Sequence, residues 1–232
     1  MENILECQNL VKFFPGCLAL NSINLAVPKG RIVGLLGPNG SGKSTMIKLA
    51  NGLITPTSGK ILIDGMEPGI ETKKIVSYLP ERTYLNDWMN ANSMINFFAD
   101  FYEDFNKQKA YDMLGRLGVD PAQRLKTMSK GTKEKVQLIL VMSREAKLYL
   151  LDEPIGGVDP AARDYILDTI ISNYSDEATI VISTHLIADV EKVLDEVVFI
   201  NQGNIVLTST VDDIREKENK SVDALFREVF KC

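Results

Sequence analysis

Several kinds of residue are scarce in this 232-residue chain, and each scarcity excludes a class of protein. The three cysteines, Cys7, Cys17 and Cys232, lie too far apart for a disulfide framework or a zinc site. No apolar run approaches the roughly 20 residues that cross a bilayer. The first ten residues lack the basic and apolar stretches of a secretion signal. We therefore expect a cytoplasmic protein with reduced thiols, which would need another protein to anchor it at a membrane.

A basic excess is also missing. The chain has 26 basic and 31 acidic side chains and a net charge of −5, whereas a general nucleic-acid-binding surface calls for a basic excess and a high pI. We therefore expect no nucleic-acid partner. Hydrophobic residues make up 45% and charged residues 25%, which is ordinary for a globular domain, and the length suits one large domain.

Strand-like and helix-like segments alternate along most of the chain. We expect strands at 4–9, 23–27, 31–36, 60–63, 148–151, 179–183, 197–200 and 205–208, and a helix from about 43 to 52. Strands that alternate with helices predict an α/β fold with a mostly parallel sheet covered on both sides. The two short segments that open the chain are expected to form an N-terminal antiparallel β portion.

The segment 82–145 changes to a helical period. One predicted helix face carries Met94, Phe97, Phe98 and Phe101, and another carries Ala110, Met113, Leu114 and Leu117. We interpret the segment as a helical subdomain inserted into a single domain. Residues 1–81 and 146–210 would form the α/β core, and 211–232 a short helical tail.

A phosphate-binding loop is the clearest motif in the chain. Residues 37–44, GPNGSGKS, match the pattern GxxxxGK[ST] in full, directly after a strand-like run and before a helical one. The glycines let backbone N–H groups surround phosphate oxygens, and the following helix adds its positive N-terminal end. We expect Lys43 to bridge the β- and γ-phosphates and Ser44 to bind Mg²⁺, as in a P-loop NTPase.

Two adjacent acids end a later hydrophobic strand, in the sequence LYLLDEP at 148–154. Ligands of parallel α/β sheets bind beyond the carboxyl ends of the strands, which would bring Asp152 and Glu153 beside the phosphate loop. There Asp152 can hold Mg²⁺, and Glu153 can polarise a water that attacks the γ-phosphate.

These motifs, in this order, resemble the ATP-binding cassette (ABC) family over nearly the whole chain. The only histidine, His185, ends the sequence ISTH at 182–185, which is similar to the family's switch that contacts the γ-phosphate. The sequence GVDP at 157–160 resembles the loop that crosses to the opposite subunit, and Asp159 with Pro160 also suits a helix start. In KFFPG at 12–16, Phe14 is the better candidate than Phe13 for stacking on adenine, although either ring could instead belong to the core.

Two positions depart from the family pattern. The signature, usually LSGGQ, is here MSKGT at 128–132, so Ser129 and Gly131 remain and Lys130 replaces a glycine. Lys130 could contact the γ-phosphate of an ATP held by the other subunit, or it could point to solvent. Glu81 stands where the family has a glutamine that contacts Mg²⁺. It could still bind the metal, and it would lie near Asp152 and Glu153, where like charges raise pKa values.

The resemblance implies ATP and Mg²⁺ as ligands and a shared active site. In the family the signature serves the ATP of a partner subunit, so two ATP molecules would join two chains, as a homodimer or with a close paralogue. The predicted nucleotide contacts are Phe14, Gly37, Pro38, Asn39, Gly40, Ser41, Gly42, Lys43, Ser44, Thr45, Ser129, Lys130 and Gly131. The predicted catalytic residues are Glu153, His185 and Lys43. The predicted Mg²⁺ ligands are Ser44, Asp152 and Glu81.

The leading functional hypothesis is an ATPase subunit that drives separate transmembrane permease subunits, which implies a place on the inner face of the membrane. The docking site is expected near 81–94, where Tyr84, Leu85, Trp88 and Met89 cluster, unless these side chains pack the insertion against the sheet. The segment and the short tail resemble bacterial exporter or multidrug-type cassettes. One alternative is a soluble cassette ATPase that acts on ribosomes or DNA. Another is a small-molecule kinase or GTPase, which would leave His185 and the signature unexplained.

Overall fold

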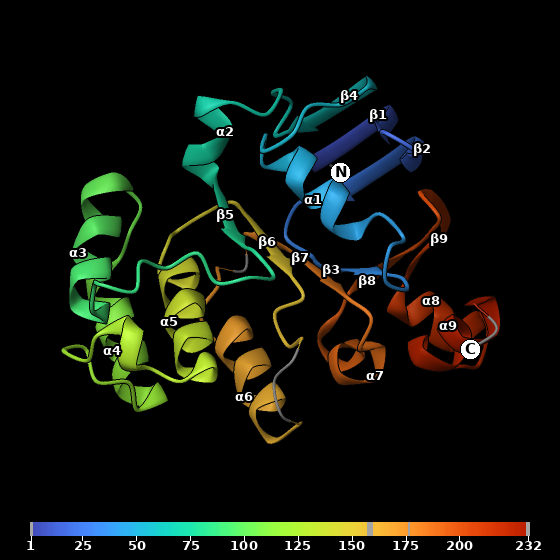
Figure 1. The fold of residues 1–232 in the computed structure, drawn as a ribbon. Helices are drawn as coiled ribbons and strands as arrows, with labels where there is room; N and C mark the ends of the chain where they lie inside the picture. The colour runs from blue at the N-terminus through green and yellow to red at the C-terminus, as the bar shows by residue number, and fades with distance from the viewer. Residues whose placement is uncertain (1, 157–159, 176, 231–232) are drawn as a thin grey trace.

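The central sheet organises the protein (Figure 1). The computed structural model describes residues 2–156, 160–175 and 177–230. The sheet has the strand order β5-β6-β7-β3-β8-β9, with bounds Val76–Leu79 (β5), Leu148–Asp152 (β6), Thr179–Thr184 (β7), Ile32–Leu36 (β3), Glu196–Asn201 (β8) and Asn204–Thr210 (β9). All neighbouring strands are parallel except β9, which is antiparallel to β8. Every residue of β3, β6 and β7 is buried, which explains their aliphatic sequences. The predicted mostly parallel sheet is confirmed.

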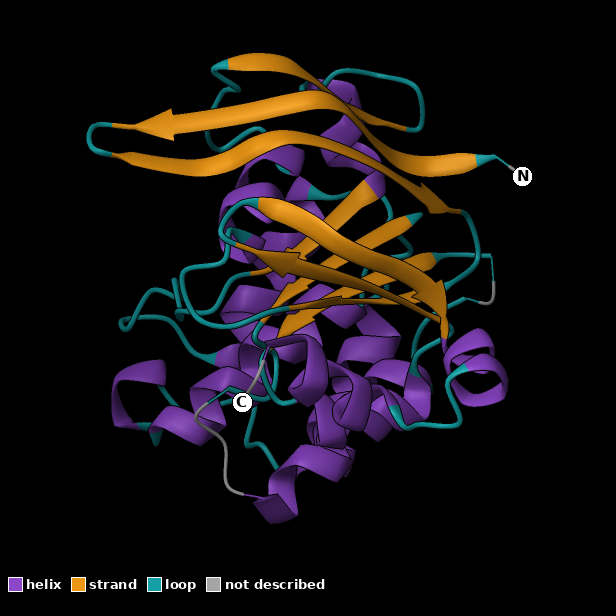
Figure 2. Cartoon of the chain, turned by 90° about the vertical axis from the view of Figure 1, so that its right-hand side faces the viewer, coloured by secondary structure: helices purple, strands orange, loops and turns teal. Residues whose placement is uncertain are grey.

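A second sheet is antiparallel, as expected for the N-terminal portion. Its order is β2-β1-β4, with bounds Asn3–Phe14 (β1), Cys17–Pro28 (β2) and Ser58–Ile63 (β4). The first two strands are longer than the sequence pattern predicts, because irregular register shifts interrupt the alternation of buried and exposed residues. Helix α1 (Lys43–Ala50) packs through Met46 and Ile47 among apolar residues of both sheets. Figure 2 shows the long strands of this sheet on one side of the core sheet and most helices on the other.

The segment between β5 and β6 is helical, as predicted. It contains α3 (Ala91–Phe101), α4 (Lys107–Leu117), the 3₁₀ turn η1 (Leu125–Thr127) and α5 (Lys130–Met142). The remaining helices are α2 (Ile70–Ile75), α6 (Pro160–Ile171), α7 (Ile187–Val190), η2 (Glu191–Val193), α8 (Val211–Lys217) and α9 (Val222–Phe230). None of the helices in the described ranges is long and apolar enough to cross a bilayer.

The apolar faces of the helical segment are buried only in part. The predicted face of α4 is buried at all four positions. On α3, Met94 and Phe98 are buried, but Phe97 and Phe101 are exposed and stack on each other. The predicted apolar face of α3 is therefore buried at two of its four positions. A helical stripe this wide has edges that turn away from the core.

Arg144 fastens the helical segment to the edge of the sheet. Its guanidinium is buried, pairs with the Asp104 carboxylate through two 2.9 Å bonds, and lies 3.9 Å from the centre of the Tyr102 ring. It also donates to the backbone carbonyls of Lys73, Lys74 and Val76, at the end of α2 and the start of β5. One side chain therefore joins the ends of α2, α3 and α5 to β5.

Removing this guanidinium should destabilise the protein. We expect Arg144→Met to lower the free energy of unfolding by about 3 kcal/mol, because it leaves three carbonyls and a half-buried carboxylate without their donor. Urea unfolding of the purified variants measures the effect. The matched control is Arg116→Met, on the exposed side of α4, which should unfold like the wild type. Equal stability of the two variants would contradict this role.

Candidate functional site

Three neighbouring strands end at the same edge of the core sheet and deliver the predicted site residues there. The order β6-β7-β3 and the pairs Asp152–Ser183 and Leu36–Thr184 bring the ends of these strands level with one another. The phosphate loop follows β3, the paired acids end β6, and His185 follows β7. The parallel pairing therefore brings the phosphate loop beside the paired acids and His185, which lie more than 100 positions later in the sequence.

The phosphate loop is pressed against the neighbouring strand. A Cβ atom at Gly37 would come 2.2 Å from the carbonyl oxygen of Ile200, so only glycine fits there. Gly42 has φ of 114° and lies close to the Ala19 carbonyl, which again requires glycine. The loop leads directly into α1, whose N-terminus carries the partial positive charge that favours phosphate.

Lys43 is held at the centre of this loop. Its ammonium is buried and donates to the carbonyls of Gly37 at 2.8 Å and Pro38 at 3.2 Å. It also lies 3.7 Å from the Glu153 carboxylate. Burial lowers the pKa of Lys43, and the negative charge of Glu153 opposes that shift.

The Ser44 and Asp152 side chains meet beside the phosphate loop. The Ser44 hydroxyl donates to Asp152 Oδ1 at 3.0 Å, and the buried Ser183 hydroxyl donates to the same oxygen at 2.5 Å. Burial raises the pKa of Asp152, the two hydroxyls lower it, and the charges of Glu153 and Glu81 raise it further. Glu81 thus acts on Asp152 as predicted, although burial is the larger cause.

These two oxygens fit Mg²⁺. The ion is commonly held by one or two protein oxygens together with the phosphates of the nucleotide and water. Among the described residues no group of three or more His, Cys, Asp or Glu is placed to hold a metal alone. A hydroxyl and a carboxylate beside a phosphate loop suit an ion that arrives with its nucleotide.

Glu153 has three polar side-chain partners: Lys43 of α1, Thr184 of β7, and His185, which follows β7. Its backbone has φ of +52°, which is uncommon for a residue with a side chain and turns the carboxylate away from the course of β6. His185 Nδ1 lies 3.1 Å from both carboxylate oxygens, and the Thr184 hydroxyl donates to Oε2 at 3.1 Å. Ser183 and Thr184 are not among the site residues predicted from the sequence. Their hydroxyls directly precede the only histidine, which is the signal that could have identified them.

A cavity of about 860 Å³ lies over these residues. Its walls include the predicted site residues Phe14, Asn39, Gly40, Ser41, Gly42, Lys43, Ser44, Thr45, Glu81, Lys130, Glu153 and His185. Gly37, Pro38, Asp152, Ser129 and Gly131 do not line it. The Ser41 hydroxyl is buried beside Gly37 and has no hydrogen-bond partner among the described residues.

Phe13 and Phe14 lie in different surroundings. Phe13 and Phe14 are 52% and 37% exposed, so neither belongs to the core, but only Phe14 lines the cavity. The ammonium of Lys12 lies 4.9 Å from the centre of the Phe14 ring. A cation over an aromatic ring at this distance is attracted to the π face of the ring.

The signature residues lie at the start of α5. Ser129 caps the helix by accepting a hydrogen bond from the Thr132 N–H at 3.1 Å, and Ser129, Lys130 and Gly131 are all exposed. Lys130 pairs with Glu134 at 3.7 Å, and both line the cavity of their own chain. The resemblance did not lead us to expect that contact. Residues 157–159 of the predicted crossing loop at 157–160 lie outside the described residues, and α6 begins at Pro160 as expected.

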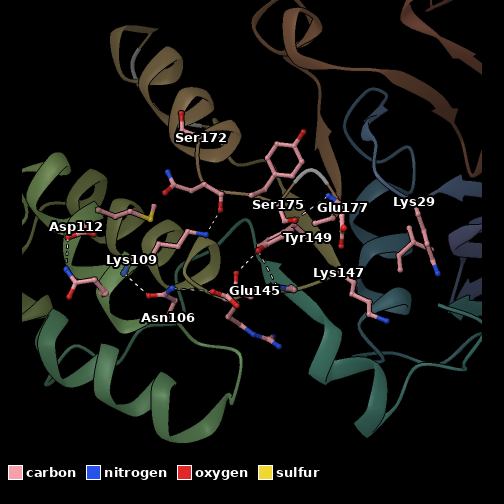
Figure 3. Close-up of a pocket in the computed structure, with 18 of the residues that line it drawn as sticks. Lys29, Asn106, Lys109, Asp112, Glu145, Lys147, Tyr149, Ser172, Ser175 and Glu177 are labelled. Atoms are coloured by element: carbon pink, nitrogen blue, oxygen red, sulfur yellow. Dashed lines mark hydrogen bonds between the residues drawn. The ribbon is translucent and has the colours of Figure 1, made fainter.

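A second large cavity lies at the other end of the core sheet, near the first residues of β6 and β7. It measures about 900 Å³ and is lined by charged residues of both signs (Figure 3). Lys109 of α4 donates there to the carbonyl of Asn173, and burial lowers its pKa. No residue predicted to bind nucleotide or metal lines this cavity.

Comparison with known proteins decides the family. The model of the ABC transporter family matches residues 20–156, which include the phosphate loop, the helical segment and the paired acids. This chain belongs to the ABC transporter family. It is an ATP-binding subunit of that family, and membership implies ATP hydrolysis.

Relatives match over most of this ABC chain. It is 28% identical over 217 residues to the ABC transporter ATP-binding protein YtrB of Bacillus subtilis (strain 168), with 92% of this chain and 74% of YtrB covered. It is 30% identical over 211 residues to the lantibiotic transport ATP-binding protein SrtF of Streptococcus pyogenes, with 90% and 92% covered. A solved ATP-binding subunit of an ABC transporter superposes with a TM-score of 0.87 at 30% identity and covers 98% of this chain and 99% of its own.

Loss of the Lys43 ammonium should weaken nucleotide binding. We expect Lys43→Ala to lower the affinity for ATP about 10- to 100-fold, because charge-assisted bonds to phosphate are lost. Titration calorimetry measures this. Lys48→Ala, on the exposed side of the same helix, is the matched control and should bind like the wild type. Unchanged binding by Lys43→Ala would remove the assignment of the phosphate loop.

Proposed function

We propose that this ABC subunit hydrolyses ATP between two copies of itself, or between itself and a close paralogue, and thereby drives separate transmembrane subunits that export a substrate. The observation that carries the proposal is the position of Glu153 at the mouth of the phosphate loop, 3.7 Å from Lys43 and 3.1 Å from His185. A carboxylate between a cation and an imidazole can take a proton from water beside the γ-phosphate.

Each polar group of the site has a role in this chemistry. Lys43 and the N-terminus of α1 bind the phosphates and stabilise the charge that develops on the transferred group. Glu153 orients and activates the attacking water, and His185 contacts both the carboxylate and the γ-phosphate. Ser44 and Asp152 would hold Mg²⁺, with Glu81 near them, and the ion would neutralise phosphate charge. Phe14 would stack on the adenine.

The position of the signature supports a shared site. Ser129 and Gly131 are exposed at the N-terminus of α5 and do not line the cavity that contains Lys43. This helix end is therefore open to a phosphate that another chain presents. Lys130 differs from Ser129 and Gly131 because it lines the cavity of its own chain. Its side chain is nevertheless 79% exposed and therefore accessible to another chain as well. Loss of the γ-phosphate would weaken the contact and let the chains part.

An apolar groove supports docking of a membrane partner. A hollow of about 680 Å³ lies between the helical segment and the core, and its walls include Tyr84, Phe97, Phe98, Phe101 and Tyr102. Exposed aromatic residues are enriched at protein interfaces. Of the predicted docking cluster, Tyr84 and Trp88 are exposed, whereas Leu85 and Met89 are buried in the core. We therefore place the contact surface on the aromatic groove and on Trp88, and withdraw Leu85 and Met89 from it.

The direction of transport rests on the relatives. SrtF is named for lantibiotic transport, and SkfE of Bacillus subtilis (strain 168), 30% identical over 220 residues, is named for peptide export. These names favour an exporter, which agrees with the resemblance to exporter-type cassettes. An exporter subunit of this kind would work at the inner face of the membrane, held there by its permease.

Replacing the proposed base should separate binding from hydrolysis. We expect Glu153→Gln to bind ATP but to hydrolyse it about 10²- to 10⁴-fold more slowly, because the amide cannot take the proton. The variant should then accumulate as an ATP-dependent dimer on size exclusion. Glu145→Gln, at an exposed position that does not line the nucleotide cavity, should hydrolyse ATP normally. A Glu153→Gln variant that stays monomeric with ATP bound would argue against the shared site.

Disrupting the aromatic groove should uncouple the subunit from its membrane partner. We expect a Phe97→Ser, Phe101→Ser double variant to recover much less polytopic protein than the wild type in affinity purification from solubilised membranes. Its stability should change little, because both rings are exposed. Phe13→Ser, which removes an exposed ring outside the groove, is the control. Recovery of ribosomes with the wild type would instead favour the soluble cassette ATPase.

A further inference from the structure

The last two residues of β7 each contact one of the paired acids, Asp152 at the end of β6 and Glu153 directly after it. Asp152 pairs with Ser183 in the parallel register, and the Glu153 N–H donates to the Ser183 carbonyl at 2.9 Å, which brings Glu153 beside Thr184. The Ser183 hydroxyl donates to Asp152 Oδ1, and the Thr184 hydroxyl donates to Glu153 Oε2 at 3.1 Å. Both hydroxyl residues are fully buried.

Thr184 is suited to hold a carboxylate in one orientation. Its oxygen accepts a hydrogen bond from the Leu186 N–H at 3.0 Å, which directs the hydroxyl proton to Glu153. The bond is also built on rigid structure, because β7 lies between β6 and β3 in the buried centre of the sheet. A bond of this kind fixes a side chain more firmly than a contact from an exposed loop.

Glu153 needs this support because Lys43 and His185 also contact its carboxylate. The Lys43 ammonium lies 3.7 Å from Oε1, and a closer ion pair would draw the carboxylate into the phosphate loop. His185, the other contact, is 42% exposed and therefore less restrained. Thr184 is the buried donor that anchors Oε2, while Oε1 contacts Lys43 and His185 at the cavity wall.

We propose that Thr184 is a positioning residue for hydrolysis, which holds Glu153 in the orientation that activates water and takes no part in nucleotide binding. The inference rests on the proposed function, in which Glu153 is the base. It predicts a change in kcat without a change in KM, since Thr184 does not line the nucleotide cavity.

The test compares four proteins: wild type, Thr184→Val, Thr184→Ser and Thr179→Val. Valine keeps the shape of threonine and removes the hydroxyl, and serine restores the hydroxyl. Thr179 is equally buried on the same strand, and its hydroxyl donates to the Pro28 carbonyl and accepts from the Gly30 N–H, far from the acids. Thr179→Val therefore controls for the general loss of a buried hydroxyl.

We expect Thr184→Val to lower kcat about 10- to 100-fold, with KM and the affinity for ATP changed by no more than about twofold. Thr184→Ser should recover most of the wild-type kcat, and Thr179→Val should keep it. A wild-type kcat in Thr184→Val, an equal loss in Thr179→Val, or a serine variant as slow as the valine variant would each overturn the proposal.

Two further measurements distinguish a loss of Glu153 positioning from misfolding and from failure of the proposed function. Valine leaves the Leu186 N–H without its acceptor, so thermal unfolding of each variant is recorded; if Thr184→Val does not fold, Thr184→Ala carries the same prediction. Glu153→Gln is assayed in parallel. If it hydrolyses ATP like the wild type, the proposed function fails; if it is inactive while Thr184→Val is fully active, only the role of Thr184 fails.

Discussion

The parallel pairing of β6, β7 and β3 is the constraint on which the rest of the site depends. Each strand ends at the same edge and carries a different part of the chemistry: the acids, the hydroxyls with the histidine, and the phosphate loop. A slip by one position would turn each side chain to the opposite face and separate Asp152 from Ser183. Every residue of these strands is buried, so a changed register would also require both faces of the sheet to repack.

The site buries the charged groups of Asp152 and Lys43, and burial of either charge alone would cost free energy. Burial raises the pKa of Asp152 and lowers the pKa of Lys43, so each shift favours the uncharged form. The negative charges of Glu153 and Asp152 offset part of the cost for Lys43, and the hydroxyls of Ser183 and Ser44 stabilise the Asp152 carboxylate. In the proposed function, a nucleotide with its metal ion would add charges of both signs, and backbone N–H groups of the phosphate loop would bind its phosphates.

In the proposed function, the helical segment would connect this chemistry to a partner in the membrane. Arg144 and the buried faces of α4 and α5 fasten it to the core, while its exposed features, the start of α5 and the aromatic pair of α3, remain open for other chains. Rigid attachment on one side and open surfaces on the other suit an element that passes a movement of the nucleotide site to a partner.

The sequence alone determined the family, the alternation of strands and helices and the identity of the phosphate loop, because these depend on local spacing and on residues such as Gly37 that no other type can replace. It could not determine which apolar residues of 82–101 are buried. Periodicity assigns Phe97 to the same face as Phe98 and places Leu85 beside Tyr84, and only packing against the core separates them. The contacts of Glu153 with Thr184, and of Lys130 with its own cavity, were likewise decided by the tertiary structure. They join positions about 30 to 90 residues apart, and strand pairing and chain folding bring such positions together in ways that local sequence does not encode.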